Sequence, residues 1–352
     1  MQTRNPSSFA IRLVAAILAV AALAIGKEFF IPIALAFCFH ALLRPVVRGL
    51  EGLRIPAWLG ATAVVLGALV VIGGGVWALS GPVGTFLERA PASISKAQAK
   101  IRAMGRPFQR VSDAASGQGP ATAAAPPSQA SAPPAAGSAP VPPLLATLLG
   151  RGTLFVTGLL EVLILLYLML AAGGTLFRKL VKVVPGPDDK RTVSDVLHET
   201  ESIVARYLLV TAVINVAQGI AVALAMWAIG MPDPWMWGLL TFALEFIPYL
   251  GGAINVGLLL VTAFTTFTST GAVILPAALY LVITTLQNNV ISPYAYGGHL
   301  KLSPLAVMIC VMFWWFVWGI PGVFLSIPIA ATLKVLGDQV PRLAPLGELL
   351  GE

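Results

Sequence analysis

The stretch Phe246-Ile247-Pro248-Tyr249-Leu250-Gly251-Gly252 interrupts one long apolar run, and Trp318-Gly319-Ile320-Pro321-Gly322 interrupts another. Proline removes a backbone donor and glycine frees the backbone, so each stretch is expected to break a helix. Inside a bilayer a broken helix exposes peptide groups, and transporters use such breaks to build binding sites. The two stretches therefore indicate a membrane protein that moves a solute.

Composition supports the membrane assignment, since 57% of the 352 residues are hydrophobic and 11% are charged. Apolar runs that approach or exceed the length of a membrane span lie near 9–26, 28–43, 57–80, 152–172 and 207–229, followed by a more irregular region at 235–268, 271–291 and 304–336. Because about 20 apolar residues span the hydrocarbon, we predict an all-α, polytopic integral membrane protein with about eight transmembrane helices and broken or re-entrant segments in its C-terminal half. Whether 235–268 and 304–336 cross fully or re-enter stays open. The first run lacks a cleavage site, so we interpret it as a retained span.

Three regions follow from this pattern: membrane spans in 1–80, an extramembrane connection in 81–150, and a C-terminal membrane domain in 151–352 that includes a cytoplasmic helix at 176–206. Within the connection, residues 87–111 have the spacing of an amphipathic helix. That helix could lie on lipid, pack between subunits of a homo-oligomer, or cover the spans. Residues 114–143 are almost all Ala, Pro, Ser, Gly and Thr, which predicts an extended linker.

Charge sets the expected orientation. Basic residues follow the second and fourth spans, namely Arg44, Arg48, Arg54, Arg178, Lys179, Lys182, Lys190 and Arg191, whereas the turn 231–234 has no Lys or Arg. Short cytoplasmic loops carry such an excess, so we expect a protein of the bacterial inner membrane with both termini in the cytoplasm. The net charge of +7 is better explained by anionic lipid headgroups than by nucleic acid.

The sequence argues against an enzyme. It contains no phosphate-binding G-x-x-x-x-G-K-[ST], no G-x-S-x-G and no H-E-x-x-H motif, and its two cysteines, Cys38 and Cys310, lie far apart in apolar runs. We therefore expect no cofactor and no metal site. An intramembrane hydrolase remains a weak alternative, because Ser, His and Asp residues exist without a recognisable arrangement.

Two carboxylates in apolar surroundings are the principal candidates for a solute or ion site, because a charge near the bilayer centre costs several kcal/mol unless it is paired or wet. Glu245 precedes the break at Pro248, where Gly251, Gly252 and, about one turn further on, Asn255 follow. Glu161 lies in the middle of the fourth apolar run. The alternative for each is a buried carboxylate with a purely structural partner.

Amides and the second break complete the predicted pathway. Asn215 and Gln218 lie three residues apart on one helical face, Asn288 and Asn289 end an apolar run, and the second break supplies the remaining candidates, Gly319, Pro321 and Gly322. The amides could equally join helices to one another, and Asn and Gly could simply end them. We expect the regions around Pro248 and Pro321 to meet near the midplane.

The C-terminal part of the chain resembles the autoinducer-2 exporter (PerM-like) family of bacterial permeases. The resemblance rests on short segments between about 150 and 345: Arg206-Tyr207-Leu208, Asn215, Gly219, Gly230-Met231-Pro232, Trp237-Gly238, Phe246 to Gly251, Asn288-Asn289, Ser292-Pro293, Gly297, Leu302-Ser303-Pro304, Phe313-Trp314, Trp318-Gly319, Gly322 and Ile327-Pro328. It implies an inner-membrane protein of about eight spans with a role in secondary transport.

These observations predict a permease that exports a small polar solute or signalling molecule, with Glu245 in ion coupling or solute binding. The first alternative is an antiporter that exchanges a monovalent cation such as sodium for protons at Glu245 and Glu161. The second is a membrane scaffold that transports nothing and recruits partners through its long connection. Family resemblance alone does not choose the solute.

Overall fold

The computed structural model describes residues 6–81, 84, 143–296, 302–340 and 343–351, and all regular secondary structure among these residues is helical. The helices are α1 (Pro6–Ile25), α2 (Lys27–Gly52), a helix at Ala57–Gly81, α4 (Pro143–Ala172), α5 (Thr175–Val183), α6 (Pro187–Ala228), α7 (Pro234–Leu244), α8 (Leu250–Thr266), α9 (Thr270–Leu286), the π-helix η1 (Gln287–Ile291), α10 (Ser292–Tyr296), α11 (Pro304–Trp318), α12 (Ile320–Gln339) and α13 (Ala344–Leu350). Five described helices are long and apolar enough to span a membrane, and five shorter ones are also apolar. The prediction of an all-α, polytopic membrane protein is confirmed. The amphipathic stretch 87–111 and the linker 114–142 lie outside the described residues.

The region 176–206, expected to form one cytoplasmic helix that runs into the fifth span, is divided between α5 and α6. Helix α5 ends at Val183, because Pro185 cannot continue it and Gly186 adopts a positive φ of 93°. Helix α6 then begins with Pro187 in its first turn and runs for 42 residues. No glycine or proline occurs between 188 and 218, so nothing in the sequence divides the amphipathic part from the apolar part.

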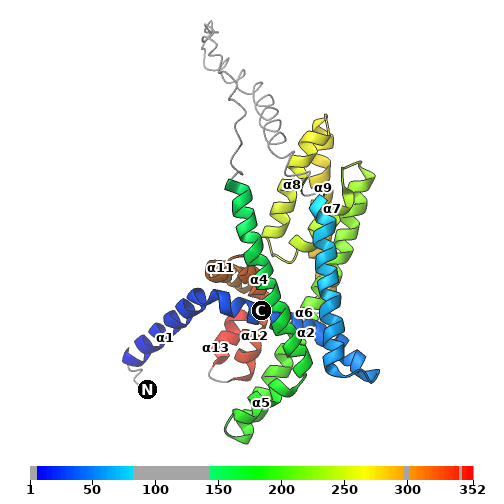
Figure 1. The fold of residues 1–352 in the computed structure, drawn as a ribbon. Coiled ribbons are helices and arrows are strands. Elements are labelled where there is room, and N and C mark those ends of the chain that lie inside the picture. The colour runs from blue at the N-terminus through cyan, green and yellow to red at the C-terminus, as the bar shows by residue number, and fades with distance from the viewer. Residues whose placement is uncertain (1–5, 82–83, 85–142, 297–301, 341–342, 352) are drawn as a thin grey trace, which may run out of the picture.

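Helices α7 and α8 form a hairpin, called here the first hairpin, which folds back on itself at residues 245–249. Figure 1 shows the two helices beside each other in the upper part of the view, together with α9 and the C-terminal part of α6. With 11 residues, α7 rises only about 16 Å, roughly half of the hydrocarbon thickness of about 30 Å. Residues 235–268 therefore do not run straight through the molecule, and α7 alone is too short to cross a bilayer.

A contact between two glycines fixes the first hairpin on α6. A Cβ atom built on Gly219 would lie 2.7 Å from the carbonyl oxygen of Gly238, and one built on Gly238 would lie 2.6 Å from the carbonyl oxygen of Gly219. Only residues without a side chain allow two helix backbones to approach so closely, as is common between membrane helices. This contact holds α7, and with it the tip of the first hairpin, against α6.

Helices α11 and α12 form a second hairpin around Gly319, whose φ of 66° is accessible mainly to glycine. It packs near the middle of α6, where Val204 and Leu208 share a buried cluster with Trp314, Trp318 and Leu325. In Figure 1 α12 lies below the first hairpin, so the two hairpins approach α6 at different levels.

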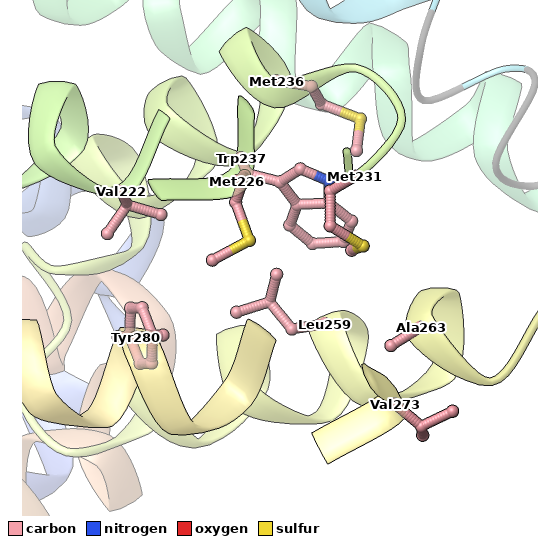
Figure 2. Packing of buried hydrophobic residues seen from close by; sticks show 9 residues of the cluster. All are labelled: Val222, Met226, Met231, Met236, Trp237, Leu259, Ala263, Val273 and Tyr280. Atoms are coloured by element: carbon pink, nitrogen blue, oxygen red, sulfur yellow. The ribbon is translucent and has the colours of Figure 1, made fainter. Parts of the chain in front are cut away.

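The first hairpin is held by a cluster of buried apolar side chains drawn from α6, α7, α8 and α9. Figure 2 shows the indole of Trp237 beside the Met226 and Met231 side chains, with Leu259 opposite them. The Trp237 Nε1 donates a 3.1 Å hydrogen bond to the carbonyl oxygen of Pro232 and so satisfies the one polar group of its side chain. The tip of the first hairpin is consequently connected to a well-packed apolar cluster.

The opposite face of α6 is apolar and exposed. Its large exposed side chains recur every three or four residues, at Leu209, Val213, Val216, Ile220, Leu224 and Trp227. A continuous apolar stripe of this length would be unusual against water and is ordinary against lipid chains. Helix α6 therefore separates a lipid-facing side from the side that carries its buried polar residues.

Candidate functional site

The tip of the first hairpin places Glu245 at the end of α7. Glu245 is the residue at which α7 ends, and the chain then turns through Pro248 and Tyr249 before α8 begins. Gly251 makes the turn possible, because a Cβ atom at this position would lie 1.9 Å from the carbonyl oxygen of Leu244. The break predicted from Pro248 and Gly251 is thus the structure that positions the carboxylate.

The Glu245 carboxylate is half-buried and receives two hydrogen bonds on one oxygen. The Tyr280 hydroxyl of α9 donates to its Oε1 at 2.5 Å, and Gln218 Nε2 of α6 donates to the same atom at 3.0 Å. Gln218 Nε2 also lies 3.0 Å from Thr284 Oγ1. Three elements, α6, α9 and the first hairpin, therefore converge on one carboxylate oxygen, and we call Glu245, Gln218, Tyr280 and Thr284 the Glu245 cluster.

The second carboxylate oxygen, Oε2, accepts no hydrogen bond from any residue that the structure describes. Buried amides nearby are also incompletely satisfied: within the described residues, Gln218 Oε1, Asn255 Oδ1 and Asn215 Nδ2 have no partner. Buried polar atoms without a partner are uncommon and usually indicate an absent water, ion or ligand. The region around Glu245 can thus offer further oxygen acceptors and an amide to a bound species.

Asn255 is connected to the site across the first hairpin. Its Nδ2 donates a 2.7 Å hydrogen bond to Thr241 Oγ1, and both residues are fully buried. Gly252, one turn earlier on α8, faces the Tyr280 hydroxyl, since a Cβ atom built there would lie 3.4 Å from that oxygen. Gly252 and Asn255 thus belong to the wall of the Glu245 cluster, whereas Gly251 shapes the turn.

Polar side chains continue along one face of α6, at Tyr207, Thr211, Asn215 and Gln218, which we call the α6 polar face. The Tyr207 ring stacks on Tyr296 with centroids 6.0 Å apart, and Thr211 Oγ1 lies 2.9 Å from the Tyr296 hydroxyl. These contacts extend the polar environment of Glu245 toward the N-terminal part of α6.

The segment around Asn288 and Asn289 forms the π-helix η1, with a wider turn than an α-helix. Both asparagine side chains are exposed, and Asn289 Nδ2 donates back to the Thr285 carbonyl at 2.8 Å. The buried member of this segment is Gln287, whose Nε2 donates to Ser292 Oγ at 3.0 Å. The sequence therefore located the polar segment Gln287 to Asn289, but the buried residue is Gln287, whereas the two chosen as pathway candidates, Asn288 and Asn289, are exposed.

Glu161 lies apart from this cluster. It is exposed on α4, and no hydrogen bond or ion pair joins it to a residue that the structure describes. The structure therefore does not bring the two candidate carboxylates together.

One aromatic contact links the tip of the first hairpin to α12 of the second. Phe246, next to Glu245, lies 5.9 Å from Phe324 of α12 between ring centroids. The second tip is shaped by Gly319 and Gly322, because a Cβ atom on Gly322 would lie 2.0 Å from the carbonyl oxygen of Trp314, and Pro321 lies in the first turn of α12. The first break is thus linked to the second hairpin by a single pair of rings, with Glu245 next to the contact.

Tyr280 and Thr284 were missed by the sequence analysis. Each is a lone polar residue in an apolar run and is unremarkable alone, but Tyr280, Thr284 and Gln287 recur at intervals of four and three residues. That spacing places them on one helical face and could have identified them.

Two of the cavities in the described part of the molecule lie away from the Glu245 cluster. A groove of about 320 Å³ between α6 and α7 is lined by apolar residues and glycines, including Gly219 and Gly238. A second, of about 510 Å³, lies between α2, α5 and α6 and is lined largely by charged and polar side chains. Within the described residues, no group of three His, Cys, Asp or Glu side chains could hold a metal ion.

Known proteins resemble this chain over most of its length. The model of a family described as AI-2E family transporter matches residues 13–342. A Haemophilus influenzae protein named "Putative transport protein" is 24% identical over 348 residues, which cover 96% of this chain and 94% of that protein. A Borreliella burgdorferi protein of the same name is 28% identical over 56% of this chain and 54% of its own length. The Escherichia coli AI-2 transport protein TqsA is 28% identical over 42% of this chain, so this match spans 43% of that relative.

Proposed function

Because the chain belongs to the AI-2E family of transporters, we propose that it is a secondary permease of the bacterial inner membrane that exports a small polar solute, with Glu245 at the solute or coupling-ion site. The observation that carries the proposal is the carboxylate at the tip of the first hairpin, held on one oxygen by Tyr280 and Gln218. A charge amid apolar helices is costly unless it is paired or in contact with water, and here one of its two oxygens is left for a ligand.

The unpartnered atoms define the chemistry of the bound species. Glu245 Oε2, Gln218 Oε1 and Asn255 Oδ1 are acceptors, and Asn215 Nδ2 is a donor, so together they suit a solute with hydroxyl groups or with ammonium donors. The name of the E. coli relative makes AI-2 the first solute to test. The contact of Phe246 with Phe324 of α12 supports a transport mechanism in which the two hairpins move relative to each other around the bound solute.

A second function, exchange of a monovalent cation for protons, is favoured by the same three oxygens. Carboxylate and amide oxygens are the ligands that hard cations prefer, and a carboxylate can take up a proton when the cation leaves. In this alternative Glu245 binds the cation and the proton in turn. Glu161, which is exposed on α4, would have to act separately.

The distribution of charge supports an orientation with the basic end in the cytoplasm. Arg44, Arg178 and Lys182 line one cavity and thus lie at the same end of the molecule, whereas the turn after α6 has no Lys or Arg. Because cytoplasmic loops generally carry an excess of basic residues, the end of the molecule at the α6–α7 turn would face the periplasm, and both termini would lie in the cytoplasm.

Transport by purified protein in proteoliposomes tests the proposal. Efflux of AI-2 that does not depend on sodium supports export, and proton movement that follows an imposed sodium gradient, recorded with an internal pH dye, supports antiport. Protein-free liposomes provide the baseline. If neither signal exceeds that baseline while the protein is inserted and folded, AI-2 export and sodium/proton exchange are both excluded, and the result supports the scaffold alternative.

Replacing Tyr280 by Phe isolates one hydrogen bond of the Glu245 cluster. The ring remains in the buried cluster of Figure 2, while the hydroxyl that donates to Glu245 at 2.5 Å is lost. Hydrogen bonds to charged groups contribute about 1.5–3 kcal/mol, so we expect transport to fall by about tenfold with folding retained. The matched control is Tyr294→Phe, since Tyr294 is 86% exposed, and equal activity of the two variants would exclude Tyr280 from the site.

A further inference from the structure

The cavity of about 510 Å³ between α2, α5 and α6 is separate from the Glu245 cluster. Its polar and charged lining consists of Arg44, Arg178, Lys182, Ser194, His198 and Glu201. Three of these side chains are cations and one is a carboxylate, so the lining has an excess of positive charge. We call this cavity the basic pocket.

Glu201 does not neutralise all the cations of the pocket, because it is already paired with Arg44. Arg44 Nε lies 3.2 Å from Glu201 Oε1, and both side chains are largely shielded, with 14% and 12% exposed. This ion pair joins α2 to α6 and forms the floor of the basic pocket. Arg178 and Lys182 of α5 are therefore left as the cations that can attract an anion.

Arg178 and Lys182 are four residues apart and so project from the same face of α5, and both line the pocket. Arg178 Nη2 donates to Thr175 Oγ1 at 3.2 Å, which orients the guanidinium and leaves its other N–H groups available. His198 Nδ1 donates to the carbonyl oxygen of Ser194 at 2.8 Å, so this ring proton is not available to a ligand. The donors that the pocket can offer to an oxyanion are therefore Arg178, Lys182 and the Ser194 hydroxyl.

The position of α5 brings the pocket to the level of lipid headgroups. The sequence TLFRKLVKV of α5 is amphipathic, and α5 directly follows the apolar α4 after two glycines. An amphipathic helix at the end of an apolar helix is expected to lie in the membrane interface, and basic pockets between helices on the cytoplasmic side bind phosphate-bearing headgroups.

We propose that the basic pocket binds a phosphate group, carried either by an anionic phospholipid or by a soluble phosphate compound. Arg178 forms charge-assisted hydrogen bonds to the phosphate oxygens, Lys182 contributes a second cation, and the Ser194 hydroxyl adds a neutral donor. The ligand would lie against both α5 and α6 and hold α5 on the helix that carries Gln218. This site is independent of the solute and of the transport mechanism.

The double variant Arg178→Gln/Lys182→Gln tests the site in purified full-length protein. Its matched control is Lys179→Gln/Lys190→Gln, which removes the same charge from the same segment at exposed positions that do not line the pocket. The melting temperature is recorded while phosphatidylglycerol, phosphatidylcholine or inorganic phosphate is added, and retained phospholipid is counted by native mass spectrometry. We expect the apparent affinity for phosphatidylglycerol to fall by about tenfold in the pocket variant and to be unchanged in the control.

The probes distinguish the two sources of phosphate. Stabilisation of the wild type by phosphatidylglycerol alone identifies a lipid headgroup, and stabilisation by inorganic phosphate as well identifies a site open to soluble anions. Two results would overturn the proposal: no stabilisation of the wild type by either anion, or equal losses in the pocket and control variants. All four positions are exposed, so neither variant is expected to impair folding.

Discussion

Replacing Glu245 by Gln is expected to reduce transport by at least about tenfold, because the variant loses the charge at the tip of the first hairpin and with it the charge assistance of hydrogen bonds worth about 1.5–3 kcal/mol each. The amide oxygen can still accept from Tyr280 and Gln218, but the NH2 group then takes the place of the acceptor Oε2. The shape of the side chain is retained, so the effect reports on charge and hydrogen bonding. It is measured as initial transport rate in proteoliposomes at equal protein density.

Glu51→Gln is the control for this experiment, since Glu51 is an exposed carboxylate near the end of α2. We expect it to transport at the wild-type rate. Normal transport by Glu245→Gln would remove this residue from the mechanism. If Glu161→Gln instead abolished transport, the site would have to be sought on α4.

Replacing Gly251 by Ala is expected to prevent the first hairpin from closing. The added Cβ would lie 1.9 Å from the carbonyl oxygen of Leu244, and a backbone atom cannot move aside as the end of a side chain can. Because a clash of this kind belongs to the most destabilising class of substitution, above about 4 kcal/mol, we expect the melting temperature in detergent to fall by on the order of 10 °C, or folded protein not to be recovered. Size-exclusion chromatography of a fluorescent fusion measures the folded fraction.

Gly257→Ala provides a matched substitution on the same helix. Nothing lies within 4 Å of a Cβ built on Gly257, and alanine favours helix more than glycine does, so this variant should be as stable as the wild type or slightly more stable. Equal melting temperatures for the two variants would mean that the turn at residues 245–249 is not as tight as described. Loss of stability in both would point to the bilayer-facing surface of α8 instead.

The sequence was sufficient to locate the break at Pro248 and the carboxylate beside it, because proline, glycine and a charge are all unusual in apolar helices. It could not supply the partners of Glu245. Gln218 and Tyr280 lie 27 and 35 residues away, and only the antiparallel packing of α6, α7, α8 and α9 brings them to one oxygen. Hydrophobic periodicity describes each helix separately and does not contain this information.

The two departures from expectation have local causes. Residues 176–206 were expected to form one cytoplasmic helix leading into the fifth span, but Pro185 and Gly186 end α5, so the region is divided between α5 and α6. Glu161 was grouped with Glu245 on its apolar surroundings alone, and those surroundings do not reveal whether a helical residue faces a neighbouring helix or the outside. Orientation about the helix axis is set by packing, which a single span does not encode.

The unbroken course of α6 has a mechanical consequence. Glu201, which pairs with Arg44, and Gln218, which bonds Glu245, belong to one helix. They are separated by about 25 Å of rise, so a tilt of about 5° around the Glu201 end would shift Gln218 sideways by about 2 Å. A displacement of that size is enough to break a 3.0 Å hydrogen bond. Whether Gln218 is hydrogen-bonded to Glu245 therefore depends on the tilt of α6 relative to the first hairpin.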